Sequence, residues 1–217
     1  MVDGAGRQVT DPNSAPRLVY DFDGIFWDAG VIWRPSRRTF LEARVGQRYD
    51  SMSYTGSLSY QIGPGSGIQI GVYDSIESFG RQLNSGLAAL PTDFVTTVDP
   101  FGNQYSGCVF GATGAAAGSC MSGILSSTST ANYRARGVTG VAVLSRGPVR
   151  LGIGGGYQRR TYIAPTTGLG SGISINGIDD ESFYAQAFAS RELGRNTAIS
   201  GNVFGSYYVS ELPGATR

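Results

Sequence analysis

The stretch RRTFLEARVGQRYDSMSYTGSLSYQIG, residues 37–63, decides the fold class. Apolar and polar side chains alternate along its first part: Leu41, Ala43 and Val45 are apolar, whereas Glu42, Arg44 and Arg48 are charged. The alternation resumes after Asp50, where every second position is apolar or aromatic, apart from Gly56. These residues are Met52, Tyr54, Leu58, Tyr60 and Ile62. In an extended chain successive side chains point to opposite faces, so a period of two predicts strands and not helices. The stretch therefore predicts two consecutive amphipathic strands.

The same period of two occurs in six further segments, which are residues 25–34, 68–73, 133–144, 149–160, 183–190 and 199–209. It is weakest in 133–144, where Val141 and Val143 alternate with Arg134 and Arg136. Most of the eight predicted strands are longer than the five or six residues typical of soluble proteins. No segment predicts a helix of normal length. The chain is therefore expected to be all-β.

The connections between these strands alternate in length. Tight turns are predicted at residues 34–37, 63–67, 145–148 and 193–196. Apart from a short link near Asp50, the other connections are long: residues 79–132 and 163–181. Short turns at one end and long loops at the other are typical of membrane β-barrels. The predicted fold is an antiparallel up-and-down transmembrane β-barrel with eight strands visible.

A membrane barrel also explains why one face of each strand is apolar and the other carries charge. Apolar side chains would face lipid, polar ones would face the lumen, and every backbone group would pair between strands. Aromatic residues that bracket the apolar face suit the two membrane interfaces: Trp27, Trp33, Tyr54, Tyr60, Tyr157 and Tyr207. A soluble all-β barrel or sandwich is the alternative, and it would place the apolar side inward.

Charged residues on the polar side are the candidate functional set. They are Asp28, Arg34, Glu42, Arg44, Arg48, Arg150 and Arg160. One hypothesis is a polar path that contacts anionic solutes or polysaccharide. The other is an internal salt-bridge network that fills a narrow barrel, because buried charges need partners. In either case Gly152, Gly154 and Gly156 are expected to leave room for arginine side chains.

Composition excludes several kinds of chemistry. The chain contains no His, and its 17 basic residues are all Arg, so His-dependent triads, P-loop lysines and Schiff bases are absent. A net charge of +1 gives no global attraction to nucleic acid. Asp28 and Glu42 do not suit glycoside hydrolysis, because interleaved arginines would lower the pKa of both carboxyls. We therefore expect a non-enzymatic protein with no catalytic residues, no metal and no cofactor.

The two cysteines, Cys108 and Cys120, lie within the long connection and enclose a small, flexible segment. Two thiols without histidine do not make a zinc site. A disulfide is the favoured interpretation and would indicate an oxidising compartment. Two free thiols are the alternative.

Several motifs resemble the outer-membrane β-barrel family associated with PEP-CTERM/exosortase exopolysaccharide systems. They are W-R-P-S-x-R-T from Trp33, L-E-A-R-x-G-x-R-Y from Leu41 and S-Y-x-G-S-L-S-Y from Ser53. The stretch ESFYAQAFASRELGRNTAIS, residues 181–200, is similar to a later hairpin of that family. The resemblance implies an outer-membrane location in a Gram-negative bacterium, with lipid, polysaccharide or envelope export components as partners. It implies no catalytic residues, and residues 79–132 have no counterpart in it.

These expectations combine into one organisation of the chain. Residues 1–17 form a polar N-terminal segment, 18–212 hold the barrel strands with the insert at 79–132, and 213–217 form a tail. If the tight turns are periplasmic, both ends of the chain are extracellular, so at least one further strand is expected on each side. The expected function is an accessory or structural protein of exopolysaccharide biogenesis or export. The alternatives are a porin-like passive channel and a surface adhesin or assembly subunit that acts through residues 79–132.

Overall fold

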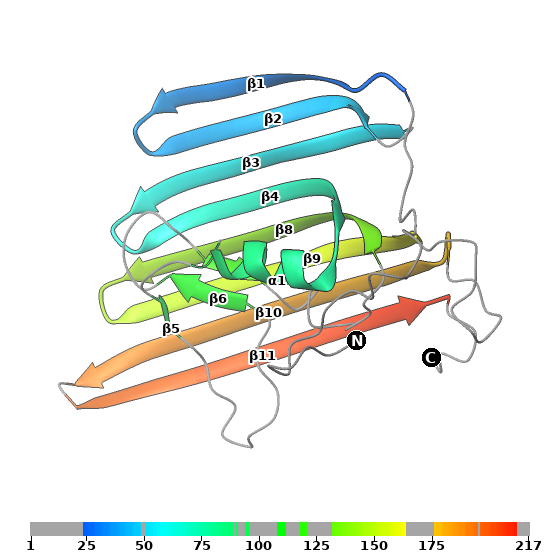
Figure 1. Ribbon diagram of the computed structural model, residues 1–217. Coiled ribbons are helices and arrows are strands. Elements are labelled where there is room, and N and C mark those ends of the chain that lie inside the picture. The colour runs from blue at the N-terminus through cyan, green and yellow to red at the C-terminus, as the bar shows by residue number, and fades with distance from the viewer. Residues whose placement is uncertain are drawn as a thin grey trace, which may run out of the picture.

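The computed structural model describes residues 24–48, 51–88, 90, 94–95, 108–111, 118–120, 132–163, 176–194 and 196–211. Eight long strands form one antiparallel sheet in the order β1-β2-β3-β4-β8-β9-β10-β11 (Figure 1). Their bounds are β1 Trp27–Ser36, β2 Thr39–Arg48, β3 Ser51–Gly63, β4 Ser66–Glu77, β8 Asn132–Arg146, β9 Val149–Ile163, β10 Asp179–Gly194 and β11 Thr197–Ser210. The all-β antiparallel class, the eight strands and their up-and-down order are confirmed.

The four predicted tight turns are also confirmed, and all lie at the same end of the sheet (Figure 1). They join β1 to β2, β3 to β4, β8 to β9 and β10 to β11. Gly65 (φ 68°) and Gly147 (φ 58°) occupy the left-handed region that tight hairpins require and that glycine adopts without strain. We call this the turn end of the sheet and the opposite one the loop end.

The strand register gathers the apolar side chains on one face. One row of paired residues crosses all eight strands, and its side chains carry no polar group apart from two tyrosine hydroxyls. Its members are Val31, Ala43, Gly56, Val72, Val138, Tyr157, Phe183 and Tyr207. The adjacent row points to the other side and is mostly polar or glycine: Ile32, Glu42, Ser57, Gly71, Thr139, Gly156, Tyr184 and Ser206. We call these two sides the apolar face and the polar face.

The segment between β4 and β8, residues 78–131, is called the insert. It contains α1 Phe79–Ala88 and a small sheet of β5 Phe94–Val95, β6 Cys108–Gly111 and β7 Gly118–Cys120. These elements lie over the polar face of the sheet near β8 and β9 (Figure 1). The expectation that the chain has no helix of normal length is therefore wrong. Ser78 caps α1: its hydroxyl accepts a bond from the Arg81 amide (3.4 Å) and its carbonyl accepts one from the Gln82 amide (2.9 Å).

Burial is inverted relative to polarity, and β10 illustrates this most clearly. Its apolar-face residues Phe183, Ala185 and Ala187 are exposed, whereas Gln186 and Asp180 on the polar face are buried. At Gln186 the insert is the cause, because its Cys108 amide donates to the Gln186 side chain, whereas Asp180 is bonded by Tyr162 and Ser210 of the sheet. The molecule therefore has its core between the insert and the polar face.

The edges of the sheet are β1 and β11, and no pairing joins them within the described residues. The predicted terminal segments, 1–17 and 213–217, lie outside the described residues. In the part of the chain that the structure describes, no helix is long and apolar enough to cross a membrane.

Candidate functional site

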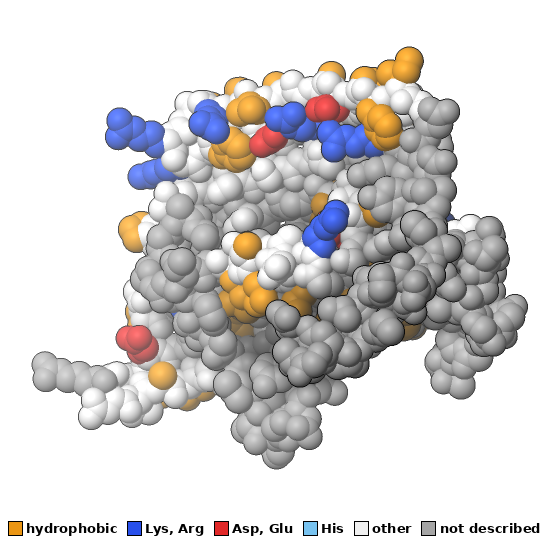
Figure 2. Space-filling model, viewed as in Figure 1, with side chains coloured by type: hydrophobic (Ala, Val, Ile, Leu, Met, Phe, Trp, Pro, Cys, Tyr) orange, Lys and Arg blue, Asp and Glu red, His pale blue; other side chains and the backbone are white. Residues whose placement is uncertain are grey.

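The polar face is the candidate functional site, and it has two parts. Over β1 and β2 the charged side chains are uncovered, as the blue and red groups in Figure 2 show. Over β8, β9 and β10 the insert covers the sheet. The seven predicted charges divide between these two parts.

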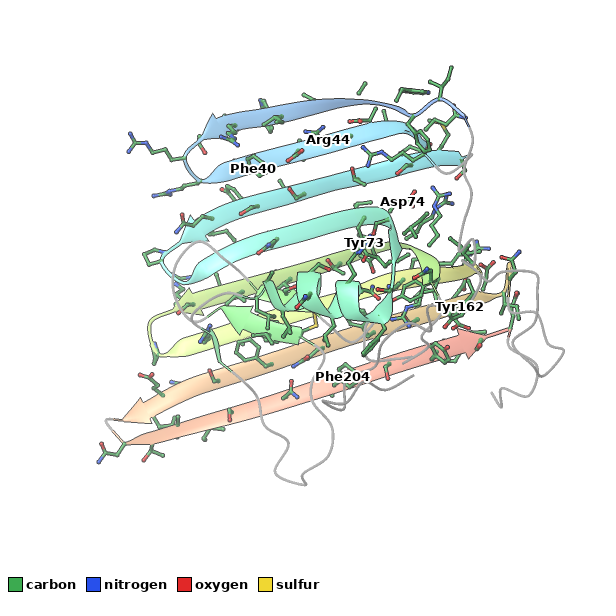
Figure 3. All side chains as sticks on the ribbon, viewed as in Figure 1. Phe40, Arg44, Tyr73, Asp74, Tyr162 and Phe204 are labelled. Atoms are coloured by element: carbon green, nitrogen blue, oxygen red, sulfur yellow. A yellow bond between two sulfur atoms is a disulfide. The ribbon has the colours of Figure 1, made fainter. Side chains whose placement is uncertain are left out.

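The uncovered part holds a small ion network between β1 and β2. Arg44 donates to Glu42 (Nε–Oε1 2.7 Å) and to Asp28 (Nη1–Oδ2 3.2 Å). Arg48 donates to the other oxygen of Asp28 (3.1 Å). The Arg34 guanidinium lies 4.6 Å from the ring centre of Phe40, which is on β2 with Arg44 (Figure 3). These groups are about a third to a half exposed, so the pairs stabilise the fold little but keep a charged surface ordered.

The covered part lies over Gly152, Gly154 and Gly156 of β9, which we call the glycine stripe. The predicted disulfide between Cys108 and Cys120 is present. A Cβ atom on Gly154 would lie 3.1 and 3.2 Å from its two sulfur atoms, and one on Gly152 would lie 2.1 Å from the Phe188 ring. The expectation that Gly152, Gly154 and Gly156 leave room for arginine is therefore wrong, since a Cβ atom on Gly156 would lie 2.7 Å from the Tyr184 hydroxyl. The room is taken by the disulfide and by aromatic side chains.

Apolar and polar contacts together hold the β6–β7 hairpin against the polar face of the sheet. The rings of Phe110 and Phe188 lie 4.6 Å apart, in a buried cluster that also contains Val141 and Val143 of β8. The Cys108 amide donates to Gln186 Oε1 (3.0 Å). The hairpin is therefore anchored by side chains of β8, β9 and β10.

Arg150 and Arg160 both lie under the insert. Arg150 donates to the Gly111 carbonyl and its guanidinium lies 5.8 Å from the ring centre of Phe188. Arg160 is buried, with its guanidinium 5.0 Å from the ring centre of Tyr133.

Helix α1 contacts β8 and β9 through the buried side-chain amide of Gln82. Gln82 Oε1 accepts a bond from the Tyr133 hydroxyl (2.5 Å) and one from Arg160 (3.4 Å). Tyr162 packs against Tyr133 with its ring at 5.9 Å and donates its hydroxyl to Asp180 (2.7 Å). These contacts fix α1 over the loop end of β8 and β9.

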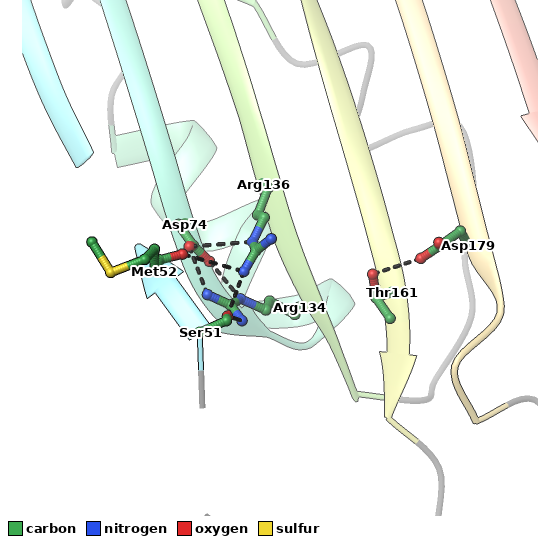
Figure 4. A network of polar contacts seen from close by, with 7 residues as sticks. All are labelled: Ser51, Met52, Asp74, Arg134, Arg136, Thr161 and Asp179. Carbon is green, nitrogen blue, oxygen red and sulfur yellow. Dashed lines mark hydrogen bonds and ion pairs between the residues drawn. The ribbon is translucent and has the colours of Figure 1, made fainter. Parts of the chain in front are cut away.

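Sequence reasoning missed a charged cluster at the loop end, on the side of the apolar face. Asp74, only 4% exposed at its side chain, binds Arg134 through two bonds (2.7 and 2.8 Å) and Arg136 through one contact of 3.3 Å (Figure 4). Both arginines also donate to the Ser51 hydroxyl. Next to them, Asp179 accepts bonds from Thr161 (2.6 Å) and Arg159.

The physical reason for the miss lies in β8. Its register puts Arg134 and Arg136 beyond the end of the apolar residues, on the same side of the sheet as Val138 and Leu144. Val141, an apolar residue, lies under the insert. The alternation in β8 is therefore real, but each set lies on the face opposite to the one expected. Arg134 and Arg136 lie on the apolar face, and Val141 and Val143 lie on the polar face. The position of Arg134 beside Asp74 could not be found without the pairing.

All six predicted interface aromatics lie on the apolar face. Four are in the half of the sheet nearer the loop end: Trp27, Tyr54, Tyr157 and Tyr207. Trp33 and Tyr60 are nearer the turn end. Tyr157 also packs on Phe183 (4.6 Å between ring centres) and donates to Glu181 (3.0 Å).

Within the described residues no group of three or more His, Cys, Asp or Glu side chains could hold a metal ion. No protein-family model matches this chain, and comparisons with curated proteins and with solved structures also find no match.

Proposed function

We propose that the protein is a non-enzymatic β-sheet protein of a bacterial outer membrane. In this proposal the apolar face contacts lipid, and the polar face lines an interior that the insert partly fills. The single observation that carries it is the inversion of burial and polarity. The most apolar side of the sheet is exposed along all eight strands, while glutamine, arginine and aspartate are buried on the other side.

The exposed fractions of large apolar side chains support this arrangement. Trp33 is 55% exposed, Ile153 is 64% exposed and Val203 is 69% exposed, and they belong to β1, β9 and β11. Soluble monomers rarely expose a contiguous apolar patch above a few hundred Å². An apolar face that spans a whole eight-stranded sheet needs a cover, and hydrocarbon chains provide one without a specific partner. A groove of about 670 Å³ on this face, lined by Ala29, Ala43 and Leu58 among others, suits a lipid chain.

The dimensions of the apolar face support the same proposal. Trp27 and Trp33 are six residues apart on β1, which corresponds to roughly 20 Å at ~3.4 Å per residue. The apolar band of outer-membrane barrels is about 25 Å tall and has aromatic residues at its borders. The cluster around Asp74 and Arg134 lies at the loop-end border, since Arg136 pairs with Arg159, two residues beyond Tyr157 on β9.

The proposal requires partners for the two edge strands. Hydrocarbon offers no hydrogen bonds, so an unpaired strand edge is not tolerated inside a membrane. In an up-and-down sheet with an even number of strands, β1 and β11 run in opposite directions. They are therefore suited to antiparallel pairing, either with each other or with further strands.

Refolding tests the proposal directly. The purified chain is diluted from urea into buffer, into detergent micelles and into phosphatidylcholine vesicles, and each product is run on a gel with and without boiling. We expect a β-rich species that migrates differently until it is boiled, and only where detergent or lipid is present. A monodisperse, soluble, β-rich protein in plain buffer would refute a membrane location.

The family resemblance supports a narrower proposal, an accessory or structural role in exopolysaccharide biogenesis or export. It rests on the motifs around Trp33, Leu41 and Ser53 and not on the geometry. Deletion of the gene in the host should then reduce secreted polysaccharide without loss of other outer-membrane proteins. Unchanged polysaccharide would leave the membrane assignment intact and remove this role.

A passive channel is the second candidate, favoured by the uncovered charges of Asp28, Glu42, Arg44 and Arg48 on the polar face. Planar-bilayer conductance separates it from a structural role. A channel should show discrete steps whose ion selectivity changes in Arg44→Gln, whereas a structural protein should show none.

A further inference from the structure

A cavity of about 270 Å³ lies between the insert and the polar face, and none of the functions above uses it. Residues of α1, β7 and four strands of the sheet line it, among them Tyr73, Glu77, Gln82, Thr139, Gln158 and Tyr184. Figure 3 shows Tyr73 on β4 close to α1. The cavity therefore depends on the insert being seated on the sheet.

Gln158 is the feature that points to a ligand. Its side chain is on the polar face of β9 and only 1% of the residue is exposed. Neither Oε1 nor Nε2 has a hydrogen-bond partner among the described residues, and Glu77 Oε2 also lacks one. Buried polar atoms in folded proteins almost always have partners. The Gln158 amide group and two acceptor oxygens therefore lack protein partners at one cavity, and a bound molecule with two donors and one acceptor would satisfy them.

We propose that this cavity binds a small, neutral, polyhydroxylated molecule about the size of a single sugar ring. A hydroxyl group both donates and accepts, so neighbouring hydroxyls can bond the Gln158 carbonyl oxygen and amide nitrogen together. A further hydroxyl would donate to Glu77, and Thr139 can bond another. The volume lies just below the 300–1,000 Å³ usual for sites that bind drug-sized ligands, which restricts the ligand to one ring.

The lining disfavours other ligand classes. An anion would lie against the Glu77 carboxylate. An organic ammonium ion would suit Glu77 and the tyrosine rings, but it carries no acceptor for the Gln158 N–H groups. Gln82 does not change this balance, because its carbonyl oxygen already accepts bonds from Tyr133 and Arg160. A neutral polyol is the class that satisfies every unpaired atom.

Ligand-observed NMR tests the proposal on the full chain with its disulfide intact. The protein is refolded in a polyoxyethylene ether detergent, whose headgroup carries neither a sugar nor a charge. The probes are D-glucose, D-galactose and D-mannose, with tetramethylammonium as the cationic probe. If the chain proves soluble in plain buffer, the same experiment is done there, so the result does not depend on the membrane proposal.

Three variants separate the outcomes. Gln158→Leu keeps most of the side-chain volume and should weaken binding of at least one sugar about tenfold. The matched control Gln61→Leu, on the polar side of β3 and outside the cavity, should bind as the wild type does. Glu77→Gln should retain sugar binding within about threefold, because an amide oxygen still accepts a hydroxyl bond. If Gln158→Leu does not fold, Thr139→Val takes its place, with the same expected direction.

Three results would overturn the proposal. The first is the absence of saturable binding by all three sugars, which would rule out a sugar ring as the ligand of this cavity. The second is equal binding by wild type and Gln158→Leu, or by its replacement Thr139→Val, which would place the sugar elsewhere. The third is binding of tetramethylammonium, but of no sugar, that is lost in Glu77→Gln.

Discussion

Replacement of Ile153 by arginine distinguishes a lipid-facing surface from a water-facing one. Ile153 lies on the apolar face of β9, four residues from Val149 at the turn end and four from Tyr157, where it pairs with Ala142 and Ala187, and it is 64% exposed. Ile199 provides a matched control on the same face. It is 62% exposed, but it pairs with Arg191 beside the last hairpin, at the turn end. The two side chains are almost equally exposed, but in the proposed membrane they would lie at different depths.

The two environments predict different free energies of unfolding. At the midplane of a membrane, arginine on the lipid face of a barrel costs about 2–4 kcal/mol, and near the interface about 0–1 kcal/mol. In water, an exposed isoleucine exchanged for arginine should change stability by no more than about 0.5 kcal/mol at either site. Ile153→Arg should therefore lower the folding equilibrium constant about 30- to 700-fold in vesicles. Ile199→Arg should lower it about fivefold at most.

The assay is urea-induced unfolding in phosphatidylcholine vesicles, followed by tryptophan fluorescence. Reversibility is checked by refolding from high urea, and the slope of the transition is compared between variants. Equal losses at Ile153 and Ile199, or changes below about 0.5 kcal/mol at both, would refute the placement of this face in lipid.

Three further predictions concern the insert and the loop end. Gly154→Val should displace the disulfide hairpin from the sheet and destabilise the fold by about 1–3 kcal/mol. Dithiothreitol should then reduce the disulfide faster than in the wild type. An unchanged reduction rate would contradict the contact between Gly154 and the disulfide. Replacing both Cys108 and Cys120 by serine should lower the free energy of unfolding by about 3 kcal/mol at most. The insert should loosen, while the far-UV circular dichroism signal of the sheet is retained. Loss of that signal would mean that the sheet depends on the insert. Asp74→Asn should destabilise by about 3 kcal/mol, because it leaves Arg134 largely buried without its carboxylate, and a loss below 1 kcal/mol in the urea assay would disprove that pairing.

The strands could be predicted because their signal is local. Alternation within each segment placed the eight long strands, and the turn residues placed the hairpins, as at Gly65 and Gly147. The disulfide could also be predicted, because two cysteines allow only one pairing. The helix α1 was missed even though Ser78 is a visible N-cap signal, because Gly80 and Gly86 weaken its helical propensity.

The candidate site could be predicted only in part, since it depends on contacts between distant segments. The charges of Asp28, Glu42 and Arg44 lie within one hairpin, and the sequence placed them together. The cavity at Gln158 needs the insert to fold back over β9, which no periodicity encodes. The glycine stripe was recognised, but whether an arginine or a disulfide fills the space above it depends on that same long-range packing.

Quenching of the two native tryptophans by brominated lipids tests the central claim most directly. The chain has only Trp27 and Trp33, and both lie on the apolar face of β1, roughly 20 Å apart along the strand at ~3.4 Å per residue. The variants Trp27→Phe and Trp33→Phe leave one reporter each in vesicles whose lipids carry bromine at defined depths. The account predicts that each tryptophan is quenched most strongly by bromine placed near the headgroups, with little quenching by iodide in the water. Strong quenching by iodide and none by brominated lipid would contradict the account.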